Sequence, residues 1–86
     1  MNDEYYIVNH EGGYWEDRFS YDTTVIGKGN AIAFANYKAK TCVCPEENER
    51  ISVHKAKVNE YFVIEKTELV YSLQANPVTL LWEVYE

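Results

Sequence analysis

The sequence predicts a single α+β domain over residues 1–86, in which one helix packs on a small antiparallel sheet in the approximate order β-β-α-β-β-β. Three observations predict this fold. A Gly-Gly turn signal follows a β-branched and aromatic run near the N-terminus. One alanine-rich segment has helical composition, and the second half of the chain alternates apolar with polar residues.

The N-terminal hairpin is predicted from the run at residues 4–9, which ends at His10-Glu11-Gly12-Gly13. A second strand is expected over about residues 14–20, and residues 21–29 are expected to form a loop or a short strand. Alternation divides the first strand into two faces, with Tyr6 and Val8 on one and Tyr5 and Ile7 on the other. One of these faces should meet the core.

The helix is predicted over residues 31–40, which are rich in alanine and carry apolar side chains at a period near 3.6. Asn30 is the expected N-cap, and Gly27-Lys28-Gly29 is expected to form a tight turn before it. Lys38 and Lys40 lie in the last turn, where cations offset the negative end of the helix dipole. Small alanines should let this helix lie close to the sheet.

The remaining chain is predicted to be β structure. An exposed loop is expected over residues 45–49, followed by a strand with an irregularity over residues 50–58. Further strands are expected over residues 61–65, 69–73 and 78–84, with turns at residues 59–60, 66–67 and 75–77. A helix stays an alternative for residues 61–64 and 69–73, because short apolar runs are ambiguous by periodicity.

The charge is concentrated at the N-terminus. Residues 1–22 contain six acids and one base, so they carry −5 of the total −6, and they also contain six aromatic residues. Rigid rings beside carboxylates favour an ordered anionic contact surface. The predicted partner-binding residues are Asp3, Glu4, Glu11, Tyr14, Trp15, Glu16, Asp17 and Asp22.

Composition excludes several classes of function. A net charge of −6 and a pI near 4.8 argue against direct nucleic-acid binding and favour a larger protein with a basic surface as partner. No stretch approaches the length of a membrane span, so no membrane association is expected. We expect a cytoplasmic location. The alternative is that the charge only keeps a small protein soluble.

Cys42 and Cys44 could share one face of a strand and, with His10 and His54, form a Cys2His2 zinc set. The spacing is unfavourable, because zinc knuckles separate paired cysteines by two to four residues. A cysteine nucleophile would need a lowered thiol pKa and a nearby base, and the sequence shows neither. We therefore predict reduced, part-buried thiols, with no metal, cofactor or catalytic residue.

Two further patterns have ordinary explanations. The segment Gly27-Lys28-Gly29 matches no phosphate-binding fingerprint. The neighbouring acids Glu16 and Asp17 could form an acid and base pair, but surface charge explains them better than catalysis. Residues 23–58 contain six bases and three acids and so carry +3, which makes an anionic ligand in this segment the chief rival to the acidic surface.

In size, acidity and a tyrosine-rich hairpin, the chain resembles small phage-encoded inhibitors such as anti-CRISPR proteins and restriction-blocking DNA mimics. It departs from the DNA mimics in its lower charge density and its net positive middle segment. The resemblance implies a non-enzymatic inhibitor that blocks a nucleic-acid-handling protein. One alternative is a structural or assembly protein whose exposed β edge at residues 78–86 pairs with another chain or with itself as a homodimer. The other is a small metal- or anion-binding domain.

Overall fold

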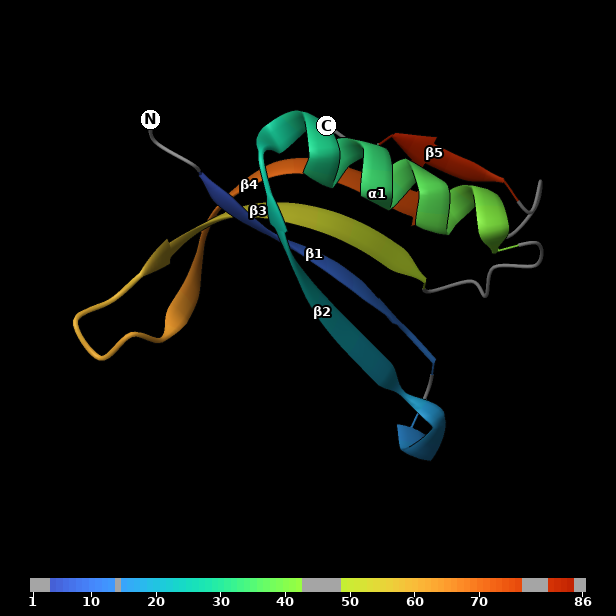
Figure 1. Cartoon of the computed structure of the whole chain (residues 1–86). Helices are drawn as coiled ribbons and strands as arrows, with labels where there is room; N and C mark the ends of the chain where they lie inside the picture. The colour runs from blue at the N-terminus through green and yellow to red at the C-terminus, as the bar shows by residue number, and fades with distance from the viewer. Residues whose placement is uncertain (1–3, 14, 43–48, 77–80, 85–86) are drawn as a thin grey trace.

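The computed structural model describes residues 4–13, 15–42, 49–76 and 81–84. One helix lies on one face of a five-stranded antiparallel sheet with strand order β2-β1-β3-β4-β5 (Figure 1), which confirms the predicted α+β class. The elements are β1 (Tyr5–Gly12), a short 3-10 helix η1 (Trp15–Asp17), β2 (Phe19–Ile26), α1 (Lys28–Thr41), β3 (Arg50–Val58), β4 (Ile64–Ala75) and β5 (Trp82–Val84).

The N-terminal hairpin exists, but its second strand begins later than predicted. β1 pairs with β2 without interruption, from Tyr5 opposite Ile26 to Gly12 opposite Phe19. Residues expected in the first half of the second strand instead form η1. Residues 21–26, expected in a loop or a short strand, form most of β2. The reason is the turn at Gly13, whose positive φ of 86° leads the chain into η1 before it returns.

Helix α1 begins at Lys28, three residues before the predicted start. Gly27 adopts a φ of 93° and redirects the chain, so the helix begins directly after it. Asn30 therefore lies inside the first turn rather than at the N-cap, and its amide donates a hydrogen bond to the carbonyl of Ile26 at 3.0 Å. Lys38 and Lys40 lie in the last turn, as predicted.

The core lies between α1 and the sheet. Ala31, Ala35 and Ala39 are spaced four residues apart, so they form one buried stripe on the helix. Their small side chains permit a close approach to the strands. The stripe packs against large apolar side chains of three strands: Tyr6 and Val8 of β1, Ile51 and Val53 of β3, and Leu73 of β4.

The opposite face of the sheet is also partly covered, although no helix lies on it. Ile7 and Asn9 of β1 point to this face and are buried. Lys66 of β4 reaches Asp22 of β2, with 3.2 Å between Nζ and Oδ1, although β1 and β3 lie between these strands. The first half of β4 must therefore bend over this face, which the register shifts between β3 and β4 around His54 permit, because the extra residues lie on β4.

The β3–β4 hairpin differs from the prediction at its turn. β4 runs without a break from Ile64 to Ala75, so the turn predicted at residues 66–67 is wrong, and residues 61–63 belong to the turn rather than to a strand. The irregularity predicted in β3 lies instead in the pairing of β3 with β4, where the extra residues are on β4, and β3 pairs with β1 in one continuous register. Asn59 closes the turn, because its Oδ1 accepts hydrogen bonds from the backbone N–H groups of Tyr61 at 2.8 Å and Val63 at 3.0 Å.

β5 lies at one edge of the sheet and covers only three residues, Trp82–Val84. The carbonyl of Leu81 accepts a hydrogen bond from the N–H of Asn76 at 2.8 Å, which joins β5 to the end of β4. Residues 77–80 and 85–86 of the predicted terminal strand lie outside the described residues. Within the part that the structure describes, no helix is long and apolar enough to cross a membrane.

Candidate functional site

The β1–β2 connection carries three of the predicted contact acids. Glu11 lies near the end of β1, and Glu16 and Asp17 are exposed in η1. Two aromatic rings follow at the start of β2. Phe19 and Tyr21 stack with their ring centroids 5.6 Å apart, and Tyr21 is 62% exposed. We call Glu11, Glu16, Asp17, Phe19 and Tyr21 the acidic end.

Glu4 lies at the other end of β1. Its carboxylate accepts a hydrogen bond from the Tyr6 hydroxyl at 2.7 Å and pairs with Lys55 at 3.5 Å. The hydrogen bond from Tyr6 and the charge of Lys55 lower the pKa of Glu4. Glu4 is thus separated from the acidic end by the length of an eight-residue strand, about 25 Å.

Asp22 is also engaged within the molecule. Its carboxylate accepts a hydrogen bond from the Asn9 amide at 2.7 Å and pairs with Lys66. Partial burial opposes ionisation, but these two contacts outweigh it and lower the pKa of Asp22. Asp22 stabilises the bend of β4 over the sheet, so it is less available for a partner than Glu16 or Asp17.

Three predicted contact residues cannot be placed. Asp3, Tyr14 and the side chain of Trp15 lie outside the described residues. The structure therefore places Glu11, Glu16 and Asp17 at one end of the β1–β2 hairpin and Glu4 at the other. Glu11 lies on the opposite face of the sheet from Phe19 and Tyr21, because its partner in β2 is Ser20. Phe19 and Tyr21 were not among the predicted contacts, although their alternate spacing on the second strand was a signal that could have identified them.

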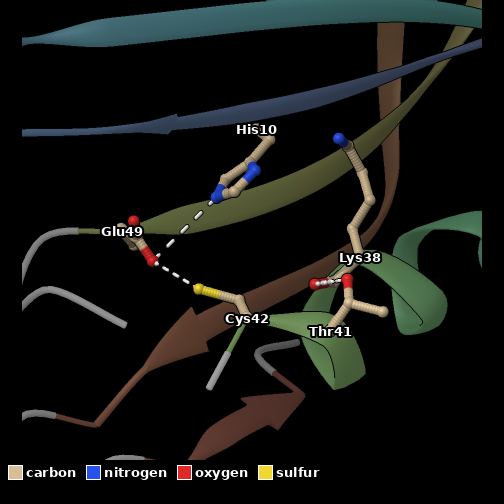
Figure 2. Close-up of polar contacts among 5 residues, drawn as sticks. All are labelled: His10, Lys38, Thr41, Cys42 and Glu49. Atoms are coloured by element: carbon tan, nitrogen blue, oxygen red, sulfur yellow. Dashed lines mark hydrogen bonds and ion pairs between the residues drawn. The ribbon is translucent and has the colours of Figure 1, made fainter. Parts of the chain in front are cut away.

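A polar cluster of Cys42, Glu49 and His10 lies beside the end of α1 (Figure 2), with Glu49 buried and the other two residues partly exposed. The Cys42 thiol donates to Glu49 Oε2 at 3.3 Å, and His10 Nε2 lies 3.9 Å from the same oxygen. Burial lowers the pKa of His10, which favours its neutral form. Because Glu49 lies between the thiol and the imidazole, His10 does not contact the thiol as a general base would.

Glu49 is a correction to the predicted exposed loop at residues 45–49, because this residue is only 7% exposed. A Cβ at Gly12 would lie 2.6 Å from Glu49 Cγ, so the absence of a side chain at Gly12 makes room for the buried carboxylate. Residues 45–48 lie outside the described residues. The cluster joins the end of β1 to the start of β3.

The zinc set considered from the sequence does not assemble where the structure can be described. Cys44 lies outside the described residues, and His54 is on β3 facing Asp22 and Lys66 rather than Cys42. Among the described residues, no group of three or more histidine, cysteine or acidic side chains could hold a metal ion.

The lysines of the positively charged segment, residues 23–58, are spread over different parts of the structure. Lys28 begins α1, whereas Lys38 and Lys40 lie in its last turn, roughly 15–18 Å away along the helix. Lys55 pairs with Glu4 at the start of β1, close to Lys28 and to the beginning of α1. These cations therefore do not form one pocket, which weakens the proposal of an anionic ligand.

The tip of the β3–β4 hairpin is a second candidate contact surface that the sequence analysis missed. Figure 1 shows this hairpin extending away from the helix and the other strands. Its exposed apolar side chains are Val58, Tyr61, Phe62, Val63 and Ile64, which we call the hairpin tip. Phe62 is 89% exposed and has a φ of 62°, in the left-handed region that disfavours non-glycine residues.

A groove of about 520 Å³ lies between the end of α1 and strands β4 and β5. Its walls are mainly apolar, and Asn36 and Lys40 of α1 supply polar groups. The Asn36 side chain is already engaged, because its Oδ1 accepts a hydrogen bond from the Tyr71 hydroxyl at 2.9 Å.

Fold and site together define a small α+β protein with two exposed candidate contact surfaces, the acidic end and the hairpin tip. Comparisons with protein-family models, with curated proteins and with solved structures gave no match.

Proposed function

We propose that this chain is a small, acidic, non-enzymatic binding protein that docks on a basic surface of a larger protein, in the manner of an inhibitor that blocks a nucleic-acid-handling protein. The acidic end is the observation that carries this proposal. Glu16 and Asp17 are exposed on a short, ordered turn, next to the stacked rings of Phe19 and Tyr21. Carboxylates on such a turn suit pairing with arginine or lysine, while an exposed ring contributes buried area.

The double variant Glu16→Lys with Asp17→Lys tests this contact. We expect it to slow association with the partner by about tenfold or more, because an acidic surface accelerates encounter with a basic one. Added salt should slow the wild-type protein in the same way. The measurement is the association rate of a partner recovered with the wild-type chain from its native host.

The matched control is Glu68→Lys with Glu83→Lys, which changes the net charge equally at exposed acids of β4 and β5. This control should associate nearly as fast as the wild type. Equal losses in both double variants would show a general charge effect and no defined site. An affinity that neither the reversal nor salt alters would exclude the proposal.

The hairpin tip supports the same class of function through an apolar contact. A hairpin that exposes five neighbouring apolar side chains is unfavourable in water, and such patches mark interaction sites. The turn is also ordered, since Asn59 accepts two backbone hydrogen bonds and its amide donates to Glu65 Oε1 at 3.0 Å. Phe62 is thus presented in a defined position despite its disfavoured backbone conformation.

A comparison of Phe62→Gly with Phe62→Ala tests whether Phe62 is retained for contact. Both variants remove the ring, but only glycine relieves the left-handed conformation, which costs other residues about 1–2 kcal/mol. Phe62→Gly should therefore be about 1 kcal/mol more stable than Phe62→Ala in urea unfolding. The reverse order would contradict the strained turn. Weaker partner binding by both variants would assign the tip to the interface.

A further inference from the structure

We propose that β2 pairs antiparallel with β2 of a second copy, which would join the two five-stranded sheets into one continuous sheet. β2 forms the edge opposite β5 and lies at the outer margin of the sheet in Figure 1. The inference goes beyond the proposed function, and it concerns a different edge from the terminal strand that the sequence suggested.

β2 lacks the features that normally protect a sheet edge. It spans eight residues, and its pairing with β1 contains no bulge. Its sequence, Phe-Ser-Tyr-Asp-Thr-Thr-Val-Ile, contains no proline or lysine and is rich in strand-forming residues. By contrast, β5 at the other edge is only three residues long. An edge strand leaves alternate backbone N–H and C=O groups directed outward, and another strand satisfies them best.

Asp22 is the only charged residue of β2, and its side chain does not protect the edge from another strand. Asp22 accepts a hydrogen bond from Asn9 and pairs with Lys66, and these contacts direct its carboxylate over the face of the sheet. A strand approaching β2 from the side therefore meets backbone groups rather than an unpaired carboxylate.

Symmetry and charge select a register. Two copies of one strand pair antiparallel about a two-fold axis, so one residue faces its own copy. An axis at Asp22 would place like charges opposite each other, which is destabilising. An axis at Thr23 keeps seven residues of each strand paired and avoids that repulsion. It places Asp22 opposite Thr24, Tyr21 opposite Val25 and Ser20 opposite Ile26 of the second copy.

This register also brings opposite charges together beyond the strand ends. In this register Phe19 lies opposite Gly27 of the second copy, and Lys28 is the next residue after Gly27. The acidic η1 of one copy therefore lies toward the basic start of α1 in the other. The interaction should for this reason weaken modestly at high salt.

The first test is light scattering on the purified chain, without any partner, over increasing concentration. We expect the mass to rise from the 10.0 kDa of one chain to twice that value. Thr23→Lys would place two ammonium groups opposite each other and should raise the dimer dissociation constant more than about a hundredfold. Thr41→Lys at the exposed end of α1 is the matched control and should dimerise normally. Urea unfolding checks that both variants fold.

The second test is a disulfide across the axis in a chain with Cys42→Ser and Cys44→Ser. Residues directly opposite in antiparallel strands have Cα atoms about 4.5–5.5 Å apart, within the range that a disulfide spans. Thr23→Cys should therefore cross-link on mild oxidation, whereas Tyr21→Cys, four residues from its own copy, should not. A monomer at every concentration, an unchanged dimer in Thr23→Lys, or equal cross-linking at both positions would overturn the inference. None of these results would bear on the acidic end and its partner.

Discussion

Replacing Ile51 by alanine is expected to lower the free energy of unfolding by about 2–5 kcal/mol. Ile51 is fully buried on β3 and belongs to the cluster that packs under the alanine stripe of α1. Deleting its methyl and methylene groups leaves a cavity, and Val8 and Val53, which are also fully buried, have little freedom to fill it. A domain of this size has a total stability of only about 5–15 kcal/mol, so much of it would be lost.

The matched control is Ile64→Ala, the same substitution in a strand but at the exposed hairpin tip. It should change stability far less than Ile51→Ala, since its side chain already meets solvent. Urea unfolding followed by circular dichroism measures both. Comparable losses at the two positions would mean that the core does not lie between α1 and β3 as described.

Replacing Gly13 by alanine should destabilise the protein through its backbone. Gly13 has a φ of 86°, a conformation that costs other residues about 1–2 kcal/mol. A Cβ there would lie 2.4 Å from the carbonyl oxygen of Asp17 and 3.0 Å from Arg18 Cα. Because these neighbours are backbone atoms, relieving the overlap should cost about 1–3 kcal/mol more. The acidic end should lose its defined geometry together with this stability.

Gly29→Ala is the control for this substitution and should have the opposite sign. Gly29 lies in the first turn of α1, and a Cβ there would have no neighbour within 4 Å. Alanine favours the helix over glycine by roughly 0.5–1 kcal/mol, so this variant should be more stable than the wild type. Thermal unfolding of the two variants checks both signs. A Gly13→Ala variant as stable as the wild type would contradict the positive φ at Gly13 in the turn that leads into η1.

The sequence predicted the candidate site only in part. Charge counting identified Glu16 and Asp17, although the sequence predicted a strand at these residues, where the structure has η1. It could not show that Lys55 pairs with Glu4 or that Lys66 pairs with Asp22, since those lysines lie more than 40 residues away along the chain. The hairpin tip was missed because an apolar run predicts a buried strand, and only the turn at Asn59 places these residues in solvent.

What the sequence alone determined is the α+β class: alternation in the strands, alanine spacing in the helix and the glycine turns are local signals that need no distant partner. Only the tertiary structure decided which acids stay available, where the long unprotected edge lies, and that Glu49 is buried against Cys42. These outcomes depend on strand order and on the bend of β4 over the sheet. Both arise from contacts between residues far apart in the chain, which local patterns do not encode.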